Sequence, residues 1–379
     1  MSSLNETPRA NRISVAFFGL RNAGKSTLVN AFTGQPVAIV SDVPGTTTDP
    51  VSKAMEILPL GPCLVTDTAG LDDIGALGEQ RVQKTLAVLA TTDLAVWVWG
   101  ETADDASPWY RRFVAECAAR RVPTLVYRRG DSVEDLKRKI AATHLVDDTP
   151  GLLDGLVAAH GRVVCVCPID ESAPKGRLIL PQVQVIRDCL DRHATCEVCQ
   201  PSELAEVLDC GRDILVITDS QAFAAVDAAV RAARDADPAR TIRLTSFSIL
   251  FARQKGDLAA FRGGLAALAS LKDGDRVLVS EGCTHHRQCN DIGTTKIPKA
   301  LAKLTGRNLD FVFSSGGGFA LEQDDGRRVA LVVHCGGCML TRREVLRRID
   351  VCRAADVPIV NYGLLLGTAA GVEVSKCAI

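Results

Sequence analysis

Several features that would mark a specialised class of protein are scarce or missing in these 379 residues. Acidic and basic residues nearly balance, 45 against 44, without long runs of one sign, so no overall field favours nucleic acid or anionic lipid. Aromatic residues make up only 4%, and no basic stripe is interleaved with them, which argues against an RNA-binding surface. The content of 47% hydrophobic and 23% charged residues is that of a globular protein and excludes a disordered or fibrous class.

Long apolar runs are also missing. No stretch approaches the roughly 18 apolar residues of a membrane span, and the polar start has no apolar signal core. We therefore expect a cytoplasmic protein with neither a membrane nor a nucleic-acid partner. Because the cytosol keeps thiols reduced, the 14 cysteines are not read as a disulfide framework. Some are expected to be metal ligands, and most to be small hydrophobes.

Apolar, β-rich runs alternate with helical patterns along the whole chain, which predicts an α/β fold. We expect three α/β domains at 1–150, 151–258 and 259–379, each with a mainly parallel sheet flanked by helices. The expected strands are 13–18, 63–66, 94–99, 124–127, 163–168, 214–218, 242–245, 276–280, 311–314, 328–333 and 359–362. The expected helices include 26–32, 181–192, 202–208, 222–233, 257–271 and 342–354.

A phosphate-binding loop follows the first predicted strand. Residues 19–26 read G-x-x-x-x-G-K-S between a strand and a helix, which is the context that this motif requires. Its backbone amides are expected to cradle nucleotide phosphates, with Lys25 against the β and γ oxygens and the Ser26 hydroxyl on Mg²⁺. The residues expected to bind the nucleotide here are Asn22, Ala23, Gly24, Lys25, Ser26 and Thr27.

Two further segments fit the same site. Asp67 ends the next apolar strand and is placed for Mg²⁺, and the Gly70 amide is placed for the γ-phosphate. Together with the segment 44–49, these pieces resemble the GTPase domain of translation-factor-related bacterial GTPases. That resemblance implies that Thr47 is the switch threonine, on Mg²⁺ and the γ-phosphate, and that Asn22 helps to hold K⁺. It makes Lys25, Thr47 and Gly70 the catalytic set. Leu71 stands where Ras-like proteins have a water-orienting glutamine, so hydrolysis is expected to be slow or cation-assisted.

The base-reading segment departs from this pattern. Guanine specificity normally comes from N-K-x-D after an apolar strand, whereas residues 128–131 read R-R-G-D. Asp131 matches the aspartate of the motif, whereas Arg128 and Arg129 stand in place of its asparagine and lysine. We expect GTP as the nucleotide, and the alternative is a site with relaxed or impaired specificity.

Cysteine and histidine residues follow two strands of the third predicted domain. Cys283 and His285 come just after one strand, and His334, Cys335 and Cys338 follow another, so all lie at carboxyl ends of strands, where sites form in parallel sheets. A closed zinc site and an iron–sulfur cluster both fit this set, and three cysteines without a fourth favour the cluster.

Other donors in this part of the chain are weaker candidates. His285 and His334 could ligate iron, donate a hydrogen bond to a sulfide or orient a loop. Glu281 is either an oxygen ligand for a fourth iron position or a surface carboxylate. Cys196 and Cys199 form a separate C-x-x-C pair, which we interpret as structural.

Longer strings make a specific resemblance visible over nearly the whole chain, to the HydF family of GTPases that mature FeFe-hydrogenase. The strings are PID at 168–170, APKGRLILPQ at 173–182, VITDSQAF at 216–223, TSFSILFAR at 245–253, CTHH at 283–286, DIG at 291–293 and HCGGCM at 334–339.

The HydF resemblance implies GTPase, dimerisation and cluster-binding domains, and a homodimer paired through sheet edges. It implies a 4Fe-4S cluster on Cys283, Cys335 and Cys338 with a variable fourth ligand. It also implies a scaffold that receives a diiron precursor from radical-SAM maturases and passes it to apo FeFe-hydrogenase. The alternative function is a ribosome- or RNA-associated GTPase with a structural zinc domain.

Overall fold

The computed structural model describes residues 8–35, 50–72, 76–101, 105, 107–143, 149–169, 178–209, 213–283, 291–316, 318–322 and 325–377. The chain divides into two compact units, Met1–Asp148 and Thr149–Ile379, and each is described by itself. None of the described helices combines the length and the apolar character needed to cross a membrane.

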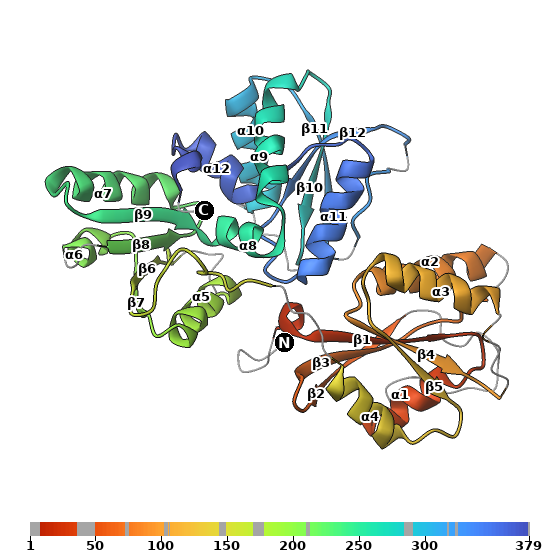
Figure 1. Cartoon of the computed structure of the whole chain (residues 1–379). Coiled ribbons are helices and arrows are strands. Elements are labelled where there is room, and N and C mark those ends of the chain that lie inside the picture. Colours follow the sequence, from red (N-terminus) through yellow and green to blue (C-terminus); the bar gives the residue numbers. More distant parts are fainter. Residues whose placement is uncertain are drawn as a thin grey trace. The chain divides into compact units, whose positions relative to one another are not determined.

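A five-stranded sheet runs through the first unit, in the order β2-β3-β1-β4-β5 (Figure 1). Its strands are β1 (Ile13–Gly19), β2 (Val51–Ile57), β3 (Gly61–Asp67), β4 (Leu94–Trp99) and β5 (Thr124–Arg128). Four strands are parallel, and β2 pairs antiparallel with β3 at the edge. Every residue of β4 is buried, as expected for an unbroken apolar run inside a sheet that is covered on both faces.

Four helices cover the two faces of this sheet: α1 (Lys25–Thr33), α2 (Ala76–Ala90), α3 (Pro108–Ala119) and α4 (Val133–Ala142). On one face, Phe32 of α1 and Ile140 of α4 belong to the same apolar cluster as Val96 of the sheet. On the other face, Phe113 of α3 packs against Trp97 with the rings tilted by 42° and their centroids 4.8 Å apart. The described helices thus form one layer on each side of the sheet.

The second unit contains two four-stranded sheets, ordered β7-β6-β8-β9 and β11-β10-β12-β13. Their strands are β6 (Arg162–Val166), β7 (Thr195–Cys199), β8 (Asp213–Thr218), β9 (Thr241–Ser246), β10 (Arg276–Glu281), β11 (Asp310–Ser315), β12 (Val329–His334) and β13 (Ile359–Asn361). All neighbouring strands in both sheets are parallel. The predicted α/β class, with mainly parallel sheets and flanking helices, is confirmed.

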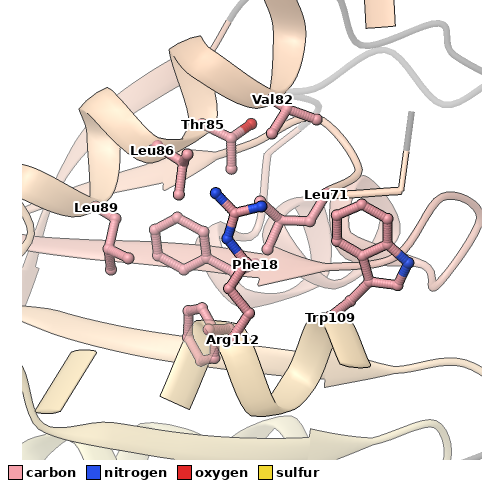
Figure 2. Close-up of a pocket in the computed structure, with 9 residues that line it drawn as sticks. Phe18, Leu71, Val82, Thr85, Leu86, Leu89, Trp109 and Arg112 are labelled. Atoms are coloured by element: carbon pink, nitrogen blue, oxygen red, sulfur yellow. The ribbon is translucent and has the colours of Figure 1, made fainter. Parts of the chain in front are cut away.

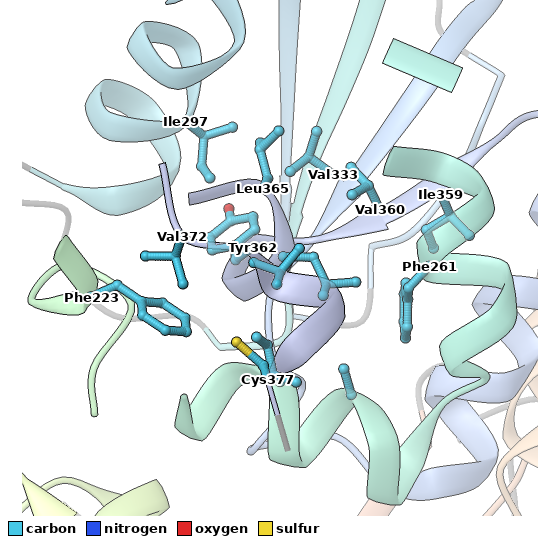
Figure 3. Packing of buried hydrophobic residues seen from close by; sticks show 14 of the residues in the cluster. Phe223, Phe261, Ile297, Val333, Ile359, Val360, Tyr362, Leu365, Val372 and Cys377 are labelled. Carbon is cyan, nitrogen blue, oxygen red and sulfur yellow. The ribbon is translucent and has the colours of Figure 1, made fainter. Parts of the chain in front are cut away.

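The helices of the second unit are α5 (Leu180–Asp191), α6 (Leu204–Leu208), α7 (Phe223–Ala236), α8 (Phe247–Lys255), α9 (Leu258–Ala266), α10 (Ile297–Thr305), α11 (Arg342–Ala354) and α12 (Tyr362–Ala369). Helix α8 leaves β9 without an intervening loop, because the Ser246 hydroxyl accepts the backbone N–H of Ile249 and caps the helix at 3.2 Å. One apolar cluster includes Val216 of β8 and Val332 of β12, so the two sheets share a core. Figure 3 shows part of this cluster, with Phe223 of α7 and Val333 of β12.

Several predicted boundaries differ from the structure, and the helix expected at 222–233 extends to Ala236. The strand expected at 359–362 ends at Asn361, because its side-chain oxygen accepts the N–H groups of Gly363 and Leu364 and starts α12. The helix expected at 257–271 is α9 followed by a short 3₁₀ turn, Ala267–Ser270. The strand expected at 163–168 ends at Val166.

Close packing fixes α9 on β13. A Cβ atom on Gly264 would lie 2.0 Å from the backbone oxygen of Ile359, so only glycine allows the helix this approach. The neighbouring Gly263 has open space at the same position. Packing of α9 therefore depends on one of two adjacent glycines.

Candidate functional site

The phosphate loop, Gly19–Ser26, is a tight turn between β1 and α1. Asn22 and Gly24 adopt positive φ angles of 54° and 87°, in the left-handed region that glycine and asparagine tolerate best. A Cβ atom on Gly19 would lie 2.5 Å from the backbone oxygen of Val98, so this position also requires glycine. Alternation of right- and left-handed residues before a helix makes a concave set of N–H groups suited to phosphate.

The charged and hydroxyl groups predicted for this site converge on the loop. Lys25 is buried, and its ammonium donates to the Leu20 carbonyl at 2.7 Å. The Ser26 hydroxyl donates to Oδ2 of Asp67 at 2.6 Å. Asp67 is fully buried, and within the described part of the chain its Oδ1 has no hydrogen-bond partner.

This environment suits a divalent cation. Burial raises the pKa of Asp67, and the Ser26 hydrogen bond and the nearby Lys25 only partly oppose that rise. A hydroxyl and a carboxylate are the hard oxygen donors that Mg²⁺ prefers. Ser26 and Asp67 therefore fit the expected magnesium position, whereas Thr47 lies outside the described residues.

The segment after Asp67 is tied to the phosphate loop. A Cβ atom on Gly70 would lie 2.7 Å from Cγ of Arg21, and the Leu71 amide donates to the Gly19 carbonyl at 3.2 Å. Asp72, which the sequence motifs did not indicate, accepts the Arg21 amide at 2.6 Å. Because Asp72 lies beyond the end of the motif, no sequence pattern marked it.

The Leu71 side chain turns into an apolar recess between α2 and α3 (Figure 2). Phe18 of β1, Leu86 of α2 and Trp109 of α3 line this recess with it. Leu71 is thus a packing residue in this structure, next to the position from which the Gly70 amide is expected to reach the γ-phosphate.

Asp131 lies just beyond β5, at the edge of the sheet where the phosphate loop also lies. Its Oδ2 accepts the Arg128 amide at 2.8 Å, and its backbone oxygen accepts the Tyr127 hydroxyl at 3.0 Å. The carboxylate is exposed and stabilises a turn. Thr27, the last residue of the predicted nucleotide set, is exposed on α1.

The three predicted cluster cysteines lie at one edge of the sheet β11-β10-β12-β13, which is the third sheet of the chain. Strands β10 and β12 are neighbours with Ser280 paired to His334, so the residues that follow them emerge side by side. Cys335 Sγ accepts the N–H groups of Gly282 at 3.1 Å and Gly337 at 3.4 Å. Among the described residues, no group of three or more His, Cys, Asp or Glu side chains is arranged to hold a metal ion.

The thiols interact electrostatically with each other. Burial raises the pKa of Cys283, and the neighbouring Cys335 and Cys338 raise it further. Burial also raises the pKa of Cys338 to about 11, with Cys335 adding to the rise and Lys255 opposing it. Soft thiol donors with N–H groups directed at sulfur fit an iron–sulfur group, which binds such thiols as thiolates.

His334 is fully buried, and both of its ring nitrogens are engaged by protein groups. Nδ1 lies 2.7 Å from the Cys335 carbonyl, and Nε2 lies 3.3 Å from Nη1 of Arg348. A carbonyl only accepts and a guanidinium only donates, so the proton sits on Nδ1 of a neutral ring. Burial, with the help of Arg348, lowers the pKa of His334 to about 4. His334 therefore orients Cys335 in this structure.

The remaining predicted donors have different outcomes. His285 lies outside the described residues. Glu281 is buried rather than a surface carboxylate, and it accepts the Tyr362 hydroxyl at 3.3 Å. Cys196 and Cys199 pack against different apolar clusters on β7, as expected for residues three apart in a strand, and Cys196 lies 3.7 Å from Cys165 between sulfurs.

Two buried cations near Cys335 were not predicted. Arg348 of α11 pairs with Glu344 at 2.7 Å, and Lys255 of α8 donates to backbone oxygens beside Cys338. In the sequence both occupy helices with other charged residues, where a cation normally lies at the surface. The one signal in the sequence for this burial is the spacing of Glu344 and Arg348, which are four residues apart on a helix and can therefore pair.

Curated relatives match part of the chain. The tRNA modification GTPase MnmE of Acidiphilium cryptum is 33% identical over 195 residues, 49% of this chain and 41% of that protein. MnmE of Myxococcus xanthus is 43% identical over 100 residues, 26% of this chain and 22% of that protein. The chain thus spans less than half the length of these relatives.

Solved structures resemble the chain only weakly. Toc33 from Arabidopsis thaliana in complex with GDP and Mg²⁺ is 20% identical, covering 34% of this chain and 58% of that chain, with a TM-score of 0.24. Aquifex aeolicus Era bound to GDP and AlF4⁻ is 14% identical, covering 89% and 97%, also with a TM-score of 0.24. Scores this low say nothing about the site.

Family models match three stretches of the chain. Residues 14–126 match the 50S ribosome-binding GTPase family, residues 152–256 match the hydrogen maturase F dimerization domain, and residues 259–376 match the hydrogen maturase F tetramerization domain. The two hydrogen maturase F models together cover more than half of the chain and follow a GTPase domain. The chain therefore belongs to the HydF family of hydrogenase maturation GTPases.

Proposed function

We propose that this chain is a GTP-binding scaffold that carries a 4Fe-4S cluster on Cys283, Cys335 and Cys338. Its cargo is the diiron subcluster, which it assembles or receives from radical-SAM maturases and delivers to apo FeFe-hydrogenase. The observation that supports the proposal is that the three cysteines follow the carboxyl ends of the neighbouring strands β10 and β12, in a region that matches a HydF domain. The cluster would supply iron sites beside which the cargo is held.

The chain's own residues would hold the cluster in a fixed setting. Gly282 and Gly337 donate to Cys335 Sγ, and His334 fixes the Cys335 carbonyl. His285 remains a candidate ligand on the strength of the sequence alone. Burial raises the pKa of Cys335, and the N–H groups of Gly282 and Gly337 oppose that rise by stabilising the thiolate. The same contacts limit the movement of the Cys335 side chain.

In the first unit, Lys25 would bind the phosphates, and Ser26, Thr47 and Asp67 would hold Mg²⁺. The Gly70 amide would orient the γ-phosphate, and Asn22 would help to place K⁺. Because no conventional general base is evident, slow GTP hydrolysis would depend on positioning and electrostatics. Asp131 is the one base-reading group kept, and its hydrogen bond to the Arg128 amide leaves its other oxygen for guanine.

Self-association is part of the proposal. Regions 152–256 and 259–376 match models named for dimerization and tetramerization, and the HydF resemblance implies a homodimer through sheet edges. Strand β7 is an edge strand with Val198 47% exposed, which leaves it accessible to a second copy. The tetramerization role was not anticipated from the sequence.

Metal and sulfide analysis of anaerobically purified protein tests the cluster. We expect iron with labile sulfide in the wild type, a large loss in Cys335→Ser, and no change in the control Cys199→Ser. Zinc without labile sulfide would contradict the scaffold proposal and support the alternative, a structural zinc site. For the nucleotide, the rate of phosphate release from GTP is measured with and without K⁺ in the wild type and in Lys25→Ala. Equal rates in the two proteins would contradict GTP hydrolysis by this chain.

An RNA-associated role is the second candidate, because the curated relatives named above are tRNA modification GTPases. The Acidiphilium cryptum match covers 49% of this chain, whereas the HydF models match residues 152–256 and 259–376. Salt-dependent binding of tRNA by the full chain would support this alternative.

A further inference from the structure

Lys255, the last residue of α8, is a buried cation that binds the turn after strand β12. It is 3% exposed, and its ammonium donates to the carbonyls of Gly337 at 3.3 Å, Cys338 at 3.1 Å and Leu340 at 2.7 Å. An ammonium has three N–H donors, so these three bonds use all of them. Lys255 therefore fixes the backbone of the cysteine turn, Cys335–Cys338, and the residues just after it.

The carbonyls satisfy the hydrogen bonds of Lys255 but not its charge. Among the residues that the structure describes, no carboxylate lies within ion-pair distance of its ammonium. A buried charge without a counter-ion is costly, and proteins rarely keep one unless an anion is nearby. The backbone that Lys255 holds carries the thiols of Cys335 and Cys338, which become anionic thiolates when they bind a metal group.

The other buried cation beside the turn has a different arrangement. Arg348 is paired with the buried carboxylate of Glu344, which also pairs with Arg347 at 2.7 Å. Arg348 therefore has a carboxylate partner within the protein. Lys255 has none among the described residues, so its charge is available to whatever the cysteine turn binds.

Helix α8 holds the same turn at its other end. A Cβ atom on Gly336 would lie 3.1 Å from Cα of Ser248, and the Ser248 hydroxyl donates to the side-chain oxygen of Asn361 at 3.3 Å. Asn361 in turn donates to the Cys335 carbonyl at 3.5 Å. The turn thus lies along α8, with Lys255 as the only lysine of that helix.

We propose that Lys255 is the counter-ion of an anionic metal–thiolate group on the cysteine turn, and that it stabilises the reduced form of that group. The inference rests on the proposed function, because it requires a group bound through Cys335 and Cys338. One-electron reduction by dithionite adds a negative charge and breaks no bond. A fixed positive charge nearby favours that added charge and raises the reduction potential.

The test is a potentiometric titration of the anaerobic full-length protein with dithionite, followed by absorbance and electron paramagnetic resonance. Lys255→Gln keeps two N–H donors for the carbonyls and removes the charge, whereas Lys255→Arg keeps the charge. The matched control is Lys303→Gln, because Lys303 also donates to a backbone carbonyl, that of Ala369, but lies exposed on α10.

We expect Lys255→Gln to make the equilibrium constant for reduction at least tenfold less favourable, which equals about 59 mV for one electron. Lys255→Arg and Lys303→Gln are expected to stay within threefold of the wild type. An unchanged potential in Lys255→Gln with full iron and sulfide overturns the inference and leaves the proposed function standing. An equal loss in Lys255→Arg also overturns it, because the charge would then not matter.

Two other outcomes are informative. If the wild type contains no iron and sulfide, both the proposed function and this inference fail. If Lys255→Gln does not accumulate as folded protein, Lys255→Arg decides alone. A potential within threefold of the wild type then supports the counter-ion, and a tenfold loss with full iron content refutes it.

Discussion

Replacing Arg348 by methionine is expected to destabilise the second unit by about 3 to 5 kcal/mol, the usual cost of removing one partner from a buried ion pair. Arg348 is 1% exposed. Its Nε donates to Glu344 at 2.7 Å, its Nη1 donates to the Ser280 hydroxyl at 3.2 Å, and its Nη2 donates to the Gly316 carbonyl. Methionine keeps most of the buried volume, so lost polar contacts dominate the change.

Neighbouring groups set where in that range the loss falls. Glu344 keeps a second partner, Arg347, at 2.7 and 2.8 Å, which moves the cost toward the lower end. The Gly316 carbonyl loses its donor, which adds about 1 to 3 kcal/mol if no water replaces it. We therefore expect a value near the middle of the range.

The pH dependence has a definite sign. Burial alone would raise the pKa of Glu344, but hydrogen bonds from Arg347 and Arg348 outweigh it and lower the pKa. A group with a lowered pKa in the folded state stabilises the fold above its unfolded pKa, and that contribution is lost as the pH falls through its folded pKa. In Arg348→Met, we expect the free energy of unfolding to fall less steeply as the pH is lowered, because Glu344 has lost one of its two arginine partners.

The assay is urea unfolding of the metal-free full chain, followed by circular dichroism at neutral and acid pH. The matched control is Arg353→Met on the same helix, because Arg353 is exposed and pairs with Asp350 at 2.6 Å and Asp257 at 3.1 Å. Exposed pairs contribute about 0 to 1 kcal/mol, so the control is expected to change little. A loss below 1 kcal/mol in Arg348→Met would refute the reasoning.

Three further predictions concern single positions. Gly264→Ala is expected to lower stability by about 1 to 3 kcal/mol, because its Cβ would overlap the Ile359 carbonyl, whereas Gly263→Ala is expected to raise helix stability by up to about 1 kcal/mol; equal urea midpoints would contradict this. Burial raises the pKa of Asp67, so its stabilising contribution exists at acid pH and is lost as the pH rises through that pKa. Asp67→Asn should therefore raise the melting temperature of the nucleotide-free protein at pH 7. It should also weaken the Mg²⁺-dependent affinity for GTP at least tenfold, or about 1.4 kcal/mol. Calorimetry measures both quantities. Leu71→Gln is not expected to speed GTP hydrolysis, because the side chain faces the apolar recess, and a rate gain above tenfold in phosphate release would show otherwise.

Much of the fold was predictable because its signals are strong and local. The β1 and β4 runs are apolar on both faces, which only a covered parallel strand explains. Residues 19–26 carry a motif whose glycines match the positive φ angles and close approaches of the loop. The exposed, antiparallel β2 was missed, because its mixed sequence VSKAMEI has no clear apolar alternation.

The setting of the candidate site was less predictable, because tertiary contacts determine it. Lys255 and Arg348 are helix residues that sequence rules place at the surface, and only the folded turn explains their burial. The role of His334 depends on two partners at separate places in the fold, the Cys335 carbonyl and Arg348. The end of β13 depended on whether the Asn361 side chain would cap a helix.

Helix α8 lies on one side of the boundary between the two family matches but supports residues on the other side. The helix falls inside the match at 152–256, yet Ser248 and Lys255 support a turn that belongs to the match at 259–376. Exchanging the last domain between family members at residue 257 would therefore separate the cysteine turn from its support. A functional chimaera needs its junction before Phe247, and we expect substitutions in α8 to be inherited together with substitutions in the turn.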